Sequence, residues 1–174
     1  MSPHAAQSRL SQLQSHLGSS EADIPRGRES ILAKHQDDIV VTCALRTPFT
    51  KGGKGGLKDV AGADLLTHAL KSLIERSHID PALVEDISVG NVLAPGGGAT
   101  EFRAASLVAG FPETTAVRAT NRQCSSGLQA VVDIANAIRC GMIEVGVGAG
   151  VESMSSQYGP GAVTEFSELV MSLG

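Results

Sequence analysis

The first hydrophobic pattern along the chain is a run of β-branched and small apolar residues at 39–45. The run is closed by Arg46-Thr47-Pro48, and a glycine-rich segment follows at 51–56. Because β-branched residues favour extended backbone and proline ends a strand, residues 39–45 predict a β-strand followed by a loop. We therefore expect the globular part of the chain to begin at residue 39.

Helical and strand-like patterns alternate over the rest of the chain. Apolar residues recur at helical spacing in three segments, 65–74, 100–108 and 125–139. Short apolar runs typical of strands separate and follow these helices, at 87–89, 116–120 and 144–149. The predicted order is β-α-β-α-β-α-β, which is typical of an α/β fold with a largely parallel sheet, helices on its faces and ligands at the carboxyl ends of its strands.

The apolar positions of the predicted helix 125–139 form one stripe. This stripe consists of Leu128, Val131, Val132, Ala135 and Ile138. Their spacing places them on a single helical face, and Gly141 ends the helix.

The two ends of the chain lack such patterning. Residues 1–38 are rich in Ser, Gln, His and charge, and they predict a tail. The pattern also dissolves from residue 155 onward, where residues 164–173 have the spacing of a short helix at most. With 174 residues, 42% of them hydrophobic, the chain is long enough for one domain core.

Charge and cysteine content exclude several classes of function. The 14 basic and 18 acidic residues give a net charge of -4, and no basic block favours a nucleic-acid partner. Cys43, Cys124 and Cys140 are odd in number and form no Cys-x-x-Cys pair, so we expect neither a disulfide framework nor a metal site. No apolar run approaches the roughly 20 residues of a membrane span, so no membrane association is expected.

Cys124 has the most suggestive position in the sequence. It directly follows the predicted strand 116–120 and precedes the predicted helix 125–139. The free N–H groups and the positive end of such a helix favour a thiolate over a thiol, and the small residues Ser125 and Ser126 leave room for a substrate. The alternative is that Cys124 is one more buried small residue, and position alone leaves both interpretations open.

The residues around Cys124 carry more information than its position. They form the run Asn121-Arg122-Gln123-Cys124-Ser125-Ser126-Gly127, and further motifs stand at 46–48, 55–59, 90–93 and 150–154. Together these motifs resemble 3-ketoacyl-CoA thiolases, almost continuously over residues 39–156. Thr120 departs from the family, which more often has an aliphatic residue there. The resemblance implies a thiolase-like fold, of which this chain would supply one incomplete β-α-β-α-β-α-β half.

The resemblance also implies a reaction. In the family a cysteine thiolate, here Cys124, attacks the keto carbon of a 3-ketoacyl-CoA, acetyl-CoA leaves, and coenzyme A then collects the shortened acyl group. Coenzyme A is a co-substrate, and no bound cofactor or metal is implied. The family's base is a histidine in a Gly-His-Pro context, and its proton shuttle is a second cysteine in a Cys-x-Gly context. The residues that fail to match these contexts are His4, His16, His35, His68, His78, Cys43 and Cys140.

The implied organisation has three parts. Residues 1–38 form the tail, 39–154 the amino-terminal thiolase domain, and 155–174 the start of a truncated loop domain. We expect the chain to be incomplete for catalysis and poorly stable alone, because a sheet edge and an apolar helix face stay uncovered. In the full-length protein the family implies a homodimer, with the strand 116–120 near the interface.

Two other functions stay open at this stage. The first is a non-catalytic product, either a truncated isoform or a fragment carried as import cargo. The second is a related condensing enzyme, a ketoacyl or hydroxymethylglutaryl synthase, against which Asn121-Arg122-Gln123 argues.

A pair of dipeptides in the tail resembles the amino-terminal peroxisomal targeting signal of peroxisomal thiolases. Arg9-Leu10 and His16-Leu17 are separated by five residues, which places both pairs on one face of a two-turn helix. Such a face would be bound by an import receptor, so a peroxisomal location is predicted. The alternative is a chance amphipathic segment, whereas acidic residues in the tail argue against a mitochondrial presequence.

Overall fold

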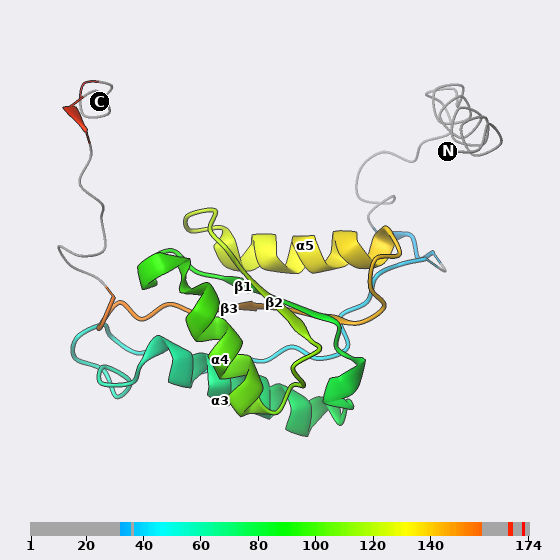
Figure 1. Cartoon of the computed structure of the whole chain (residues 1–174), viewed down its shortest axis with the longest axis horizontal. Helices are drawn as coiled ribbons and strands as arrows, with labels where there is room; N and C mark the ends of the chain where they lie inside the picture. The colour runs from blue at the N-terminus through cyan, green and yellow to red at the C-terminus, as the bar shows by residue number, and fades with distance from the viewer. Residues whose placement is uncertain (1–31, 36, 158–166, 169–171, 173–174) are drawn as a thin grey trace. The chain divides into compact units, whose positions relative to one another are not determined.

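The computed structural model describes residues 32–35, 37–157, 167–168 and 172 (Figure 1). The chain divides into two compact units, Met1–Asp38 and Ile39–Gly174, and the fold described below belongs to the second. The tail signal and most of the predicted helix 164–173 lie outside the described residues. The described elements are α3 (Gly62–Ser77), η2 (Pro81–Leu83), β1 (Asp86–Gly90), η3 (Pro95–Gly98), α4 (Ala99–Ala109), β2 (Ala116–Thr120), α5 (Ser126–Arg139) and β3 (Gly146–Gly150).

The three strands form one parallel sheet in the order β2-β1-β3. The register pairs Gly90, the last residue of β1, with Thr120 on one side and with Gly150 on the other. All three strands therefore end at one edge of the sheet. In parallel α/β sheets this carboxyl edge is where ligands bind.

Helices cover both faces of the sheet. In Figure 1, α3 and α4 lie on one side of the strands and α5 lies on the other. The core lies on the α3 and α4 side, where Ile87 and Val89 are fully buried with Leu66, Leu70 and Phe102. Each such side chain stabilises the fold by about 1.5–3 kcal/mol relative to an exposed one.

Glycines bring α5 unusually close to the other face of the sheet. A Cβ atom at Gly148 would lie 2.7 Å from Val131 Cα, and one at Gly90 would overlap the backbone of Ser126. Real Cβ atoms do not come this close, so only glycine permits this helix position. As a result, the first turn of α5 lies directly over the carboxyl end of β1.

The fold confirms the α/β prediction and corrects two details. The predicted strand at 39–45 is wrong, because these residues form no strand hydrogen bonds. The segment lines a cavity together with β3 and does not pair with that strand's open edge, and its side chains Cys43 and Leu45 are half-buried. Within the described residues the order is therefore α-β-α-β-α-β.

The second correction concerns the apolar stripe of α5. The residues buried against the sheet are Ala130, Ile134 and Ala137. Leu128, by contrast, is 70% exposed, and Val131 and Val132 are 42% and 39% exposed. The glycine-lined sheet therefore packs against the side of α5 that carries Ala130, Ile134 and Ala137, with Val131 beside Gly148.

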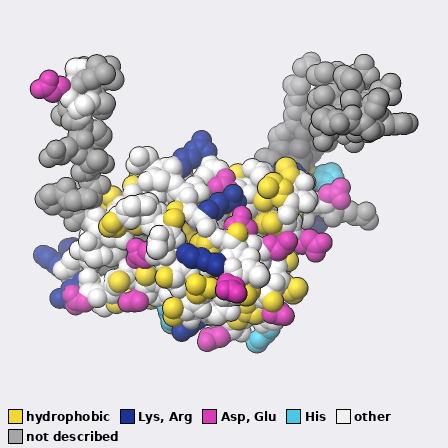
Figure 2. Space-filling view, in the orientation of Figure 1, with side chains coloured by type: hydrophobic (Ala, Val, Ile, Leu, Met, Phe, Trp, Pro, Cys, Tyr) yellow, Lys and Arg dark blue, Asp and Glu magenta, His cyan; other side chains and the backbone are white. Residues whose placement is uncertain are grey.

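The surface carries a mixed charge pattern. Figure 2 shows acidic and basic side chains interspersed on one face, with apolar side chains scattered among them. Among the described residues, no helix combines the length and apolarity that crossing a bilayer requires.

Candidate active site

The candidate site is built around the turn that joins β2 to α5. Asn121 accepts a hydrogen bond from the Gln123 amide at 3.0 Å, and Gln123 itself has a left-handed backbone with φ of 51°. Non-glycine residues adopt this conformation at a cost, so the turn must be held by its surroundings. Cys124 follows Gln123 and is exposed to solvent.

Ser126 closes the turn from the helix side. Its hydroxyl accepts from the Arg122 amide at 2.9 Å and donates to the Gln123 carbonyl at 2.6 Å. Ser125 occupies the N-cap position of α5, but its side chain makes no cap hydrogen bond. The side-chain hydrogen bonds that fix the start of the helix therefore come from the first helical serine.

The first turn of α5 contains backbone N–H groups without hydrogen-bond acceptors among the described residues. The amides of Gly127 and Leu128 have no hydrogen-bond acceptor among the described residues, while the Ser126 amide donates to the Gln123 carbonyl. Unpaired amides at a helix start carry a partial positive charge and favour negative groups nearby. Cys124 lies two residues before this helix, at the position predicted from the sequence.

A carboxylate links the other two strand ends. Glu152 follows β3, and its carboxylate accepts from the amides of Val92 and Leu93 at 3.0 and 3.1 Å and from Asn91 Nδ2 at 3.2 Å. Charge-assisted hydrogen bonds of this kind are stronger than neutral ones. The loop after β1 is therefore fixed to the residues after β3.

Asn121 connects this cluster to the cysteine turn. Its side-chain amide donates to the Val92 carbonyl at 3.2 Å, so the loops after all three strands are joined by side-chain hydrogen bonds. Sequence reasoning assigned no role to Asn91 or Glu152. The available signal was their position, because each stands within three residues of a predicted strand's carboxyl end.

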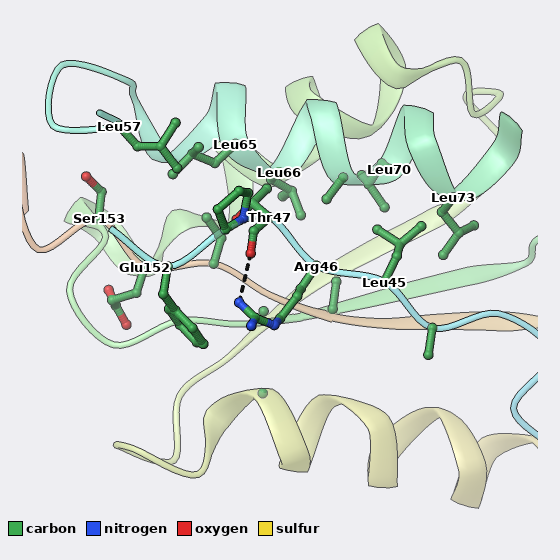
Figure 3. Close-up of a pocket in the computed structure, with 18 of the residues that line it drawn as sticks. Leu45, Arg46, Thr47, Leu57, Leu65, Leu66, Leu70, Leu73, Glu152 and Ser153 are labelled. Atoms are coloured by element: carbon green, nitrogen blue, oxygen red, sulfur yellow. Dashed lines mark hydrogen bonds between the residues drawn. The ribbon is translucent and has the colours of Figure 1, made fainter. Parts of the chain in front are cut away.

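A cavity of about 650 Å³ opens beside this edge. Its walls come from the extended segment, from α3, from β3 with the residues after it, and from Gly127 and Val131 of α5. Figure 3 shows leucine side chains of α3 along the cavity, with Glu152 and Ser153 at one end. The lining is mostly aliphatic, so the space suits an apolar group more than a charged one.

The other cysteines and histidines are placed elsewhere. Cys140 is the C-cap of α5, a helix of 14 residues and about 21 Å in length, so it lies a full helix away from Cys124. Cys43 is half-buried in the extended segment. His68 and His78 belong to α3 and its C-cap, across the sheet from α5. Among the described residues, no cluster of three or more His, Cys, Asp or Glu is arranged to hold a metal.

Comparison with known proteins identifies the family. The family described as "Thiolase, N-terminal domain" matches residues 39–172. The chain belongs to the thiolase family. The thiolase fold expected from the sequence is thereby confirmed, with this chain as part of one half of it.

Known thiolases resemble the chain over most of its length. The peroxisomal 3-ketoacyl-CoA thiolase of Yarrowia lipolytica is 55% identical over 159 residues, which is 91% of this chain and 38% of that protein. The chain thus spans less than half the length of this thiolase.

Solved thiolase structures also match. The dimeric peroxisomal thiolase of Saccharomyces cerevisiae is 44% identical with a TM-score of 0.75, covering 83% of this chain and 38% of that one. A second structure of that organism's enzyme, with a TM-score of 0.70 and 47% identity over 73% of this chain and 38% of that one, has five layers built from two core domains of identical topology. An Ascaris suum thiolase in complex with coenzyme A has a TM-score of 0.57 and 31% identity, covering 66% of this chain and 31% of that one.

Proposed function

We propose that Cys124 is the acyl-accepting nucleophile of a 3-ketoacyl-CoA thiolase acting in fatty-acid β-oxidation. The observation that carries this proposal is an exposed cysteine in a hydrogen-bonded turn at the carboxyl edge of the sheet, two residues before α5. A thiolate there is open to an acyl-CoA and lies near unpaired helix amides.

The reaction has two balanced steps. The Cys124 thiolate bonds to the keto carbon of 3-ketoacyl-CoA, and the bond between that carbon and the α-carbon breaks. The departing enolate takes a proton, from the family's second cysteine or from water, to become acetyl-CoA. The thiol of coenzyme A, deprotonated by a base, then attacks the acyl-cysteine thioester. Shortened acyl-CoA leaves and the Cys124 thiolate returns.

Complete turnover requires more than this chain. The histidine base and second cysteine that the resemblance implies match no histidine or cysteine of its sequence. We place both in a longer protein, in line with the 38% of the Yarrowia lipolytica thiolase that the chain spans. In that protein the outward apolar side of α5 would pack on a second core domain like that of the yeast enzyme, and two subunits would form a dimer. Coenzyme A is the co-substrate, with no bound cofactor.

The experiment is acylation of the chain by acetoacetyl-CoA, followed by mass spectrometry of its peptides. We expect one acetyl group on Cys124, lost in Cys124→Ser and kept in the control Cys140→Ser, because Cys140 is exposed but lies at the opposite end of α5. An acetyl group on Cys140 in preference to Cys124 would contradict the proposal.

The location proposed for the protein is the peroxisome. Its support is the Arg9-Leu10 and His16-Leu17 pattern together with the names of the relatives, several of which are peroxisomal thiolases. A fluorescent reporter fused behind residues 1–20 should collect in peroxisomes, and exchanging Leu10 and Leu17 for Asp should leave it in the cytosol. A diffuse signal from the unchanged fusion would defeat this assignment.

A non-catalytic role is the second candidate. This candidate is a truncated isoform or an import-cargo fragment, and it is favoured by the sequence, in which no histidine or cysteine matches the contexts of the family's base and second cysteine. Failure of Cys124 to accept an acyl group, with the chain folded, would favour this role.

A further inference from the structure

We propose that Asp133 is a positioning residue, which holds the Cys124 turn in place through two hydrogen-bonded arms. The proposal rests on the proposed role of Cys124 as nucleophile and adds a residue of α5 to the site. Asp133 belongs to the second turn of the helix and is half-buried.

The first arm reaches the end of β2. Thr120 is the last residue of that strand, and its hydroxyl donates to one carboxylate oxygen of Asp133 at 3.2 Å. This contact fixes the point at which the chain leaves the sheet and enters the turn.

The second arm reaches into the turn itself. The side-chain amide of Gln129 donates to the other carboxylate oxygen of Asp133 at 2.7 Å, and the Gln129 carbonyl oxygen accepts from the Arg122 guanidinium. Gln129 thereby transmits the position of Asp133 to a residue two before Cys124. The chain Asp133, Gln129, Arg122 runs from half-buried helix to exposed turn.

The two arms bracket Asn121 and act on a turn that needs support. Thr120 and Arg122 flank Asn121, and Gln123 has the left-handed backbone that costs free energy in a non-glycine residue. Releasing both arms would let the turn relax and move Cys124 away from the start of α5. The unpaired amides at that helix start would then influence the thiolate less.

The charged side chains near Asp133 pair with each other rather than with Asp133. Arg118 and Asp86 line the same small pocket as Asp133, but they pair with each other at 3.3 Å. Both direct partners of the Asp133 carboxylate, Thr120 and Gln129, are neutral. Asp133 therefore acts through the hydrogen bonds that it accepts rather than through its charge. An asparagine, which keeps one acceptor oxygen, should replace it better than an alanine.

The test compares rates of iodoacetamide labelling at Cys124 in the full chain, resolved by peptide mass spectrometry. We expect Asp133→Ala to slow labelling by about threefold, the scale of a helix-terminus effect on a nearby charge. Gln129→Ala should also slow labelling, but by less, because it cuts only the second arm and leaves the bond from Thr120 to Asp133 in place. Asp133→Asn should restore most of the rate. The matched control is Asn136→Ala, one turn further along α5, where no side-chain hydrogen bond is lost.

Cys140 is an internal reference, because it is exposed at the other end of the same helix. Unchanged Cys140 labelling and an unchanged circular dichroism spectrum show that α5 remains folded in each variant. Equal Cys124 rates in the wild type, Asp133→Ala and Gln129→Ala would overturn the proposal, as would a loss in Asp133→Ala alone. If wild-type Cys124 labels no faster than Cys140, the proposed nucleophile fails instead, so the two failures are distinguishable.

Discussion

At the scale of single residues, two buried hydroxyls show how a hydrogen bond decides whether a buried polar group stabilises or destabilises the fold. Thr115 is 1% exposed and donates to the Val84 carbonyl at 2.8 Å, which secures the start of β2. Ser88 is fully buried in β1, and its hydroxyl has no partner among the described residues. Burying a hydroxyl costs free energy unless a hydrogen bond compensates, so the two should respond oppositely to removal.

We expect Ser88→Ala to raise the free energy of unfolding by about 1 kcal/mol and Thr115→Val to lower it by about 1 kcal/mol. Urea titrations of both variants and the wild type give the comparison. A clear loss of stability in Ser88→Ala would mean that its hydroxyl is paired after all.

At the candidate site, some residues can be predicted from the sequence and others cannot. The place of Cys124 could be predicted, because a position between a strand and a helix is a local property of the chain. Glu152 and Asp133 could not, because an exposed or half-buried carboxylate in sequence resembles any solvated acid. Their roles come from partners such as Val92, 60 residues away in the chain from Glu152.

At the scale of elements, α5 is the helix whose packing the sequence predicted least well. Its helical periodicity was correct, but the single apolar face predicted from it is not the one that is buried against the sheet. Ile134 is 5% exposed against the sheet, whereas Val132 is 39% exposed on the outward side. Only the glycines of β1 and β3 decide which side approaches the strands.

Ile134→Ala should therefore lower the free energy of unfolding of this chain by about 3 kcal/mol, because it leaves a cavity under the helix. Val132→Ala should change it by about 0.5 kcal/mol or less, since a partly exposed valine loses little burial and alanine favours the helix. Denaturant unfolding distinguishes the two. A comparable loss of unfolding free energy in both variants would mean that the outward side of α5 is also buried in this chain.

At the scale of the whole molecule, the chain carries the proposed nucleophile, but none of its histidines and neither of its other cysteines matches the contexts of the family's base and proton shuttle. The fold supplies a carboxyl edge, a cysteine turn and a helix start, all within residues 86–152. No described histidine lies on the α5 face of Ile39–Gly174. Acylation and turnover should therefore be separable.

We expect the chain, given acetoacetyl-CoA and coenzyme A, to release no acetyl-CoA beyond the single equivalent of Cys124 acylation, because no base activates the second thiol. The measurement is acetyl-CoA by chromatography over time, with Cys124→Ser as the blank. Continuous release that Cys124→Ser abolishes would show that the chain holds a complete centre.

The sequence by itself determined the positions of the three strands and three helices and the place of Cys124 among them. It did so because helical and strand periodicity, glycines and prolines act over short stretches of chain. The sequence did not determine that residues 39–45 would stay outside the sheet. An apolar run predicts an extended backbone, but it does not predict whether a neighbouring strand will pair with that backbone.

Only the tertiary structure decided which side of α5 faces the sheet and how the three strand ends are tied together. Those outcomes depend on contacts between residues far apart in the chain, such as Gly148 with Val131 and Asn121 with Val92. Periodicity within one segment contains no information on its neighbours in space. The place of Cys124 could therefore be predicted from the sequence, while the hydrogen bonds that hold its turn could be found only in the fold.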